Sequence, residues 1–141
     1  MKKLIVTILS IVTFVGGFLI FYQSRPVEQK MPITDWESKT DNQLAVTITV
    51  TPIDISSQLK KWEFEIVMDT HSVELNQDLT KMAVLVDDQG KEYKPLSWEG
   101  TIGGHHREGL LIFNQIIPTP KSVQLKVSGI GDVIRSFDWQ L

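Results

Sequence analysis

The three histidines of this sequence are its main candidates for a chemically functional site. His105 and His106 follow the glycine pair at residues 103–104, and His71 lies in a second polar segment, residues 68–72. Neutral imidazole is a common ligand of zinc and copper, and three imidazoles can hold an ion that keeps one coordination position open. We therefore expect any chemical site to lie where these two segments meet.

A metal site here would hold copper or zinc through the three imidazoles, those of His71, His105 and His106. Asp69 would add an oxygen ligand or orient one of the rings. Adjacent residues of a regular strand point to opposite faces, so the histidine pair could share one ion only if the backbone is irregular there. The competing interpretation is that all three are loop residues that hydrogen-bond to backbone groups. We favour it because the sequence has no His-x-His or His-Glu-x-x-His motif.

Two further residues near the histidine pair are candidate contacts for a ligand or partner. Trp98 lies just before Gly100 and is expected to be exposed at the loop, where an aromatic ring can anchor a partner. Arg107 adds a positive charge beside the histidines, which disfavours a bound cation and leaves Arg107 as a partner contact. Trp62 and Trp139 fall within alternating patterns and are expected in the core.

Catalytic motifs are missing from the sequence. A serine hydrolase built on Ser72 would be expected to show a Gly-x-Ser-x-Gly motif, and none occurs. Residues 100–104 are glycine-rich but are not followed by the Lys-Ser/Thr of a phosphate-binding loop. The chain has no cysteine, which excludes disulfides, thiol catalysis and cysteine-based zinc sites. We therefore expect no catalytic activity.

The N-terminal segment has the composition of a membrane anchor. Residues 4–22 carry no charged side chain, and 13 of them are Leu, Ile, Val or Phe. As a helix they would span about 28 Å, close to the ~30 Å hydrocarbon core of a bilayer. A cleaved signal peptide would have a shorter apolar region and a small-x-small site before Pro26, which is not found. We expect an uncleaved signal anchor over residues 1–22, with Lys2 and Lys3 in the cytoplasm and the remainder outside it.

The charge of the chain limits its partners. Its net charge is −3, and without Lys2 and Lys3 it holds 12 basic and 17 acidic residues, a net of 12 − 17 = −5. An acidic domain repels phosphate backbones, so nucleic acid is not an expected partner. We expect a single membrane span and a protein or envelope partner outside the cytoplasm. The sequence leaves the oligomeric state open.

After a polar linker over residues 23–43, apolar residues recur with a period of two, which is typical of half-buried strands. The pattern predicts seven strands, at residues 44–51, 62–68, 82–86, 91–93, 109–117, 122–127 and 133–141. Asp-Asp-Gln-Gly at residues 87–90 predicts a turn, so its flanking strands should form a hairpin. Residues 44–141 are therefore expected to fold as one all-β, immunoglobulin-like β-sandwich, with a Greek-key barrel as the alternative.

Residues 85–93 combine an apolar strand, an acidic turn ending in glycine and a tyrosine on the return strand. In this hairpin the chain resembles small, membrane-anchored immunoglobulin-like proteins, most of them uncharacterised. The resemblance covers this hairpin alone. It implies an architecture and an extracytoplasmic setting, and no activity. The predicted function is a membrane-anchored binding module without catalytic activity, and the alternative is a metal-binding domain.

Overall fold

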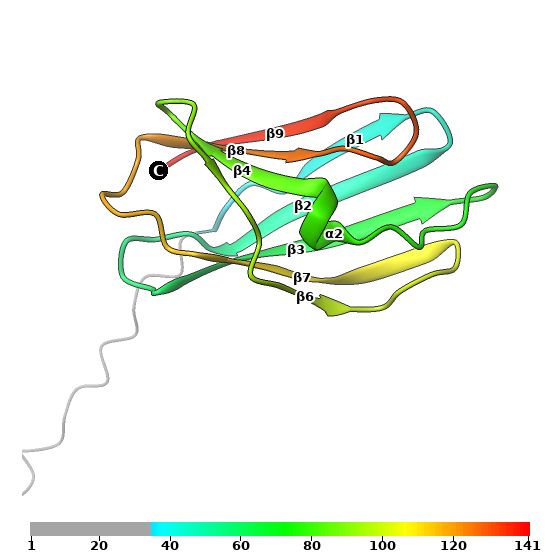
Figure 1. Ribbon diagram of the computed structural model, residues 1–141, viewed down its shortest axis with the longest axis horizontal. Coiled ribbons are helices and arrows are strands. Elements are labelled where there is room, and N and C mark those ends of the chain that lie inside the picture. The colour runs from blue at the N-terminus through cyan, green and yellow to red at the C-terminus, as the bar shows by residue number, and fades with distance from the viewer. Residues whose placement is uncertain (1–34) are drawn as a thin grey trace, which may run out of the picture. The chain divides into compact units, whose positions relative to one another are not determined.

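The structure, a computed structural model, describes residues 35–141, which fold into two antiparallel sheets packed face to face (Figure 1). The strands are β1 (Lys39–Gln43), β2 (Val46–Asp54), β3 (Lys61–Thr70), β4 (Ala83–Asp87), β5 (Glu92–Tyr93), β6 (Ser97–Gly100), β7 (His106–Asn114), β8 (Ser122–Val127) and β9 (Arg135–Gln140). One sheet has the order β1-β2-β3-β7-β6 and the other β5-β4-β8-β9. The prediction of an all-β sandwich is confirmed.

A short helix, α2 (Leu79–Met82), precedes β4. Among residues 35–141 no helix is long and apolar enough to cross a membrane. The predicted anchor, residues 1–22, lies outside the described residues, as does most of the predicted linker.

Alternation along the strands builds the core. On β3, Trp62, Phe64, Ile66 and Met68 are fully buried between the sheets, while the residues between them face outward. The ring of Phe64 meets Phe113 of β7 edge-on at 5.7 Å between centroids and lies 5.6 Å from Trp139 of β9. Each such aromatic side chain contributes roughly 1.5–3 kcal/mol by leaving water. The predicted core positions of Trp62 and Trp139 are confirmed.

Residues 35–141 form nine strands, where the sequence predicted seven. β1 lies within residues 23–43, the expected linker, and pairs with β2 along its whole length. Its sequence, Lys-Thr-Asp-Asn-Gln, is polar on both faces, so hydrophobic periodicity could not reveal it. β6 lies in an expected loop and is only four residues long. The folded domain therefore begins before residue 44.

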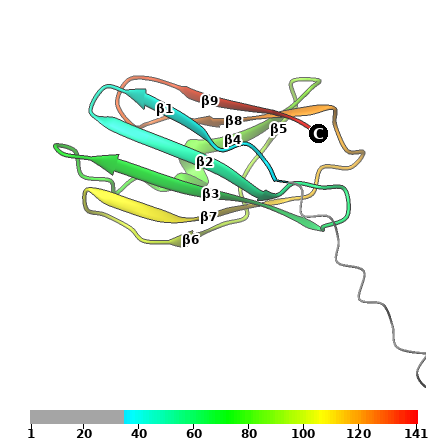
Figure 2. The same ribbon diagram turned by 180° about the vertical axis from the view of Figure 1, so that it is seen from behind.

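The loops gather at two ends of the sandwich. One end holds the β1–β2 turn, residues 71–78, the β6–β7 loop at residues 101–105 and the β8–β9 turn; we call it the histidine end (Figures 1 and 2). The opposite end holds residue 35, the C-terminus and the β4–β5 hairpin. That hairpin closes as predicted, because the Asp87 carboxylate accepts hydrogen bonds from the amides of Gln89 and Lys91.

A buried arginine joins the two sheets at the histidine end. Arg135, at the start of β9, is fully buried and donates to the carbonyl oxygens of Ile130 at 2.6 Å and Gln43 at 2.8 Å. Its Nε lies 3.1 Å from Oδ1 of Asp41, which forms an ion pair across the β1 and β9 edges. A charge in this position requires such partners, since an unpaired buried charge is costly.

Candidate functional site

The two histidine segments meet in the structure, a point that the sequence left open. The amide of Thr70, at the end of β3, donates to the carbonyl of His105 at 2.9 Å. Farther along, Leu75 and the β6–β7 loop exchange two backbone hydrogen bonds, Leu75 N to Gly104 O and Gly103 N to Leu75 O. Both glycines have positive φ angles, 84° at Gly103 and 83° at Gly104, a conformation that other residues rarely adopt. The glycine pair thus lets the β6–β7 loop lie against residues 71–75.

Strand pairing brings together two of the predicted site residues. Asp69 of β3 lies directly opposite His106 of β7 in the register. Nδ1 of His106 is 2.5 Å from Oδ1 of Asp69, and Nε2 is 3.6 Å from Oε2 of Glu108. The hydrogen bond with Asp69 and its negative charge raise the pKa of His106 above its ordinary value of 6.5, and Glu108 adds to this shift.

This pair predicts a pH dependence of stability. Because the pKa of His106 is raised on folding, its stabilising effect is fully present below pH 6.5 and is lost as the pH rises through the higher folded value. Asp69→Asn should lower the folded pKa of His106, and the difference in unfolding free energy between the two proteins should shrink as the pH rises. Ring-proton NMR titration and urea unfolding measure the two effects. Asp132→Asn, at the same end, is the control, and an equal shift there would contradict the assignment.

The three imidazoles do not form one ligand set. His71 and His105 are exposed, and His106 is engaged by its two carboxylates. Across residues 35–141 there is no group of three or more His, Asp or Glu side chains arranged to hold a metal ion. The structure therefore joins Asp69 to His106 but does not bring His71 and His105 into the same group.

Arg107 does not lie where a partner could reach it, which corrects the prediction. It is 1 % exposed, and it donates to the carbonyls of Thr101 at 2.7 Å and Gln77 at 2.6 Å. Alternation explains the difference: on β7 the side chain of Arg107 points inward, between the outward-facing His106 and Glu108. Burial lowers the pKa of its guanidinium, and the charge of Asp78 partly offsets that shift.

Trp98 packs beside Arg107 and contacts the start of the same β6–β7 loop. Its ring is half-buried, and its indole N–H donates to Thr101 O at 3.1 Å. The Arg107 guanidinium lies 4.9 Å from the ring centroid, a cation–π distance. Gly100 and Gly109 face each other across β6 and β7, and a Cβ on either would meet the Trp98 ring within 3 Å. Trp98 therefore covers a glycine pair, and its expected exposure at a loop holds only in part.

A pocket of about 400 Å³ opens at the histidine end, between the β1–β2 turn and the end of β3. It is lined by Asn42, Leu44, Ala45, Thr47, Asp69, Thr70, His71 and Ser72. Thr70 is buried and donates through its hydroxyl to Ala45 O at 2.7 Å, which fixes the turn against β3. The pocket wall thus includes Asp69 and His71, two of the predicted residues.

The same end exposes three large apolar side chains. Leu44 in the β1–β2 turn is 71 % exposed, Ile102 in the β6–β7 loop 74 % and Ile134 in the β8–β9 turn 65 %. Leu44 has a positive φ of 57°, which is uncommon for a leucine and sets it at the turn. Sequence periodicity placed Leu44 on the apolar face of a strand. The turn geometry shows that Leu44 points into solvent, and hydrophobic periodicity in the sequence contains no information about that geometry.

No protein-family model matches the chain, and no curated protein is similar to it in sequence. Two solved structures have a similar arrangement of strands. A DUF4426 family protein from Pseudomonas aeruginosa PAO1 has 10% sequence identity and a TM-score of 0.44, over 74% of this chain and 92% of that one. The secreted protein MPT63 from Mycobacterium tuberculosis has 14% identity and a TM-score of 0.42, over 77% and 94%. The class of this chain rests on its own geometry, which is that of a two-sheet β-sandwich.

Proposed function

We propose that the chain is a binding module of immunoglobulin-like architecture, held at a membrane by residues 4–22, with its sandwich outside the cytoplasm and without catalytic activity. The observation that carries the proposal is the histidine end. Leu44 and Ile134 lie on the neighbouring β1–β2 and β8–β9 turns, and Ile102 lies at the other edge of the five-stranded sheet, so three loops of one end expose apolar surface. Exposed apolar surface of this kind is a feature of interaction surfaces. Beside them, Asp69 and His106 supply polar groups that fix orientation.

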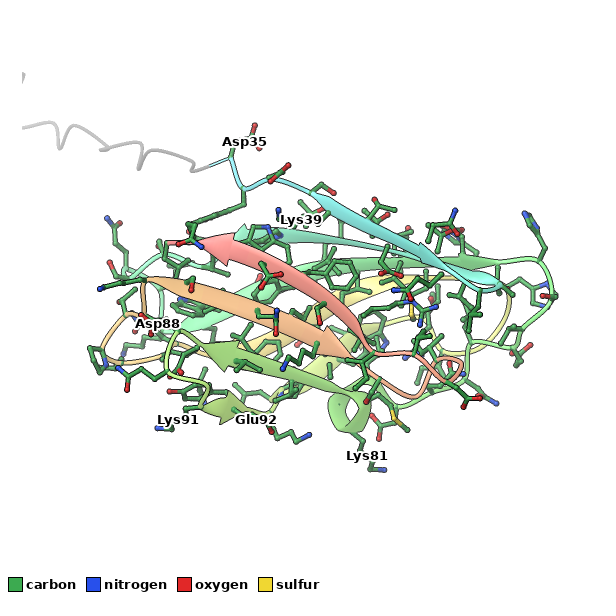
Figure 3. The ribbon with its side chains drawn as sticks, turned by 90° about the horizontal axis from the view of Figure 1, so that it is seen from above. Asp35, Lys39, Lys81, Asp88, Lys91 and Glu92 are labelled. Atoms are coloured by element: carbon green, nitrogen blue, oxygen red, sulfur yellow. The ribbon has the colours of Figure 1, made fainter. Side chains whose placement is uncertain are left out.

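The position of this end suits a tethered module. Residue 35, from which the chain continues toward the predicted anchor, lies at the other end of the sandwich, as the labelled Asp35 shows (Figure 3). In the proposed arrangement the loops of the histidine end are then free to meet a protein or another component of the envelope.

The absence of cysteine allows a direct test. In the full chain, Leu44→Cys, Ile102→Cys and Ile134→Cys each place one thiol at the histidine end. A membrane-impermeant crosslinker, reactive to thiols and amines, is added to cells whose cytoplasmic membrane is intact. We expect each variant to form a crosslink to the same partner, read by gel shift and mass spectrometry. The matched control is Ile117→Cys, 80 % exposed at the opposite end, which should react with the reagent without capturing that partner.

Two results would contradict the proposal. If none of the four thiols reacts until the cells are lysed, the domain is not outside the cytoplasm. If all four react and none captures a partner, or all capture the same proteins equally, the histidine end is not a specific binding surface.

The alternative function is copper or zinc binding. One observation favours it, the hydrogen bond between Thr70 and His105 that sets the two histidine segments side by side. Because the side chains of residues 35–141 form no metal-holding group, a shared ion would require the side chains of these loops to rearrange. In calorimetry of the full chain with Zn²⁺ or Cu²⁺, tight one-to-one binding lost in both His71→Ala and the His105→Ala/His106→Ala double variant would favour this function. Weak binding that is indifferent to these changes would remove it.

A further inference from the structure

The outer face of the five-stranded sheet carries an uneven distribution of charge. Because Trp62, Phe64, Ile66 and Met68 of β3 point inward, the alternate residues of β3 point outward. The same alternation on β6 and β7 turns further carboxylates to this side. The acidic face, as we define it, comprises Glu63, Glu65 and Asp69 of β3, Glu99 of β6 and Glu108 of β7. One lysine, Lys61, shares this side of these three strands, at the start of β3.

The strand register places the carboxylates around apolar side chains. Glu65 of β3 and Glu99 of β6 are both paired with Leu110 of β7, so they flank it from either side. One step along, Glu108 is paired with Val67. Leu110 and Val67 are half-buried. Diagonal neighbours across antiparallel strands lie roughly 7–8 Å apart, within reach of long side chains, so Glu108 repels both Glu65 and Glu99.

Few cations balance these charges. Asp69 and Glu108 have His106 as a partner, but Glu63, Glu65 and Glu99 form no ion pair with any other residue of the described part of the chain. Figure 2 shows that no strand or helix of residues 35–141 lies over this side of the sheet. A cation from outside this domain would therefore relieve the repulsion that Glu65 and Glu99 experience.

The shape of the face indicates which cations fit. A shallow hollow of about 360 Å³ is lined by Glu65, Glu99, Gly100, Thr101, Glu108, Gly109 and Leu110. Its lining combines three glutamates with Leu110 and two glycines. Lysine and arginine match both kinds of lining, because their aliphatic stems pack on apolar surface while their charged ends meet carboxylates. A small hydrated ion would gain nothing from the apolar part of the lining.

We propose that the acidic face binds a lysine- and arginine-rich segment of a partner protein. This surface is separate from the loops of the histidine end, so the inference goes beyond the proposed function and can fail independently of it. Opposite charges on two surfaces speed their encounter and select partners of the right sign, and both effects weaken as salt screens the charges.

The test uses the full chain in neutral detergent and a fluorescent peptide of alternating lysine and serine. Fluorescence anisotropy at low salt should show saturable binding, which weakens as salt is raised. The triple variant Glu65→Gln, Glu99→Gln, Glu108→Gln removes three charges from the acidic face with little change in shape. We expect it to bind the peptide at least about tenfold more weakly.

The matched control removes the same number of charges elsewhere. Asp88→Asn and Glu92→Gln lie on the β4–β5 hairpin, in the other sheet (Figure 3), and Asp132→Asn lies in the β8–β9 turn. We expect this variant to bind within about twofold of the unchanged chain, since it leaves the local field of the face intact. Equal weakening in both triple variants would show that only net charge matters and would overturn the proposal. The absence of saturable binding at low salt, with both variants folded by circular dichroism, would overturn it too.

Discussion

Replacement of Arg135 by methionine is expected to lower the free energy of unfolding by about 3–5 kcal/mol. The guanidinium is fully buried and donates hydrogen bonds to the carbonyls of Ile130 and Gln43. Asp41, whose side chain is 18% exposed, would keep its charge but lose the cation 3.1 Å away. Methionine fills much of the same volume, so the loss should come from unsatisfied polar groups rather than from a cavity.

Urea unfolding of the full chain, followed by tryptophan fluorescence, measures this effect. Lys126→Met is the matched control, because it makes the same change of charge at a half-buried site on β8 with no hydrogen bond that depends on it in residues 35–141. It should change the unfolding free energy by no more than about 0.5 kcal/mol. A loss in Arg135→Met no larger than in the control would show that Arg135 does not hold the two sheets together.

The strands that the sequence predicted are those with one apolar face. Apolar and polar residues alternate without interruption along β3 and β8, so this pattern predicted the ends of both strands to within about two residues. β1 has no apolar face, and it pairs with β2 because the backbone hydrogen bonds and a row of threonine hydroxyls, such as Thr40 with Thr49 at 2.9 Å, hold it there. Such an edge strand depends on its neighbour, and a pattern read along a single strand cannot supply that information.

The sequence singled out the histidine loops as candidates, but it did not indicate their contacts. The structure shows that these loops meet, which could not be inferred from the sequence. The pairing of Asp69 with His106 follows from the antiparallel register of β3 and β7, two strands with more than 30 residues between them. Arg107 is buried because side chains alternate between the two faces of β7 and its position is on the inward face. Both depend on which strands are neighbours, and that order is fixed by the whole sandwich rather than by local sequence.

The second large effect is expected at Arg107, where methionine should lower the free energy of unfolding by about 2–4 kcal/mol and loosen the β6–β7 loop. Arg107 donates to Thr101 O in that loop and to Gln77 O in the segment before α2. It thus reinforces the backbone hydrogen bonds that join the two segments at Leu75. It also lies on the ring of Trp98. Without it, Thr101 O keeps the hydrogen bond from the Trp98 indole, but Gln77 O must turn toward water, and the loop must shift to let it do so.

Hydrogen exchange separates the local from the global part of this effect. In Arg107→Met the amide of Gly103, which donates to Leu75 O, should exchange faster by more than the global loss of stability explains. Lys94→Met, an exposed position just before β6, makes the same change of charge and should leave that amide unaffected. If Gly103 exchanges no faster than the core amides of β3 in Arg107→Met, the arginine stabilises the fold as a whole and does not specifically hold the loop.

The exposed Ile102 lies in the β6–β7 loop that Arg107 holds. In Arg107→Met the loosened loop should therefore weaken a crosslink formed through Ile102→Cys more than a crosslink formed through Ile134→Cys.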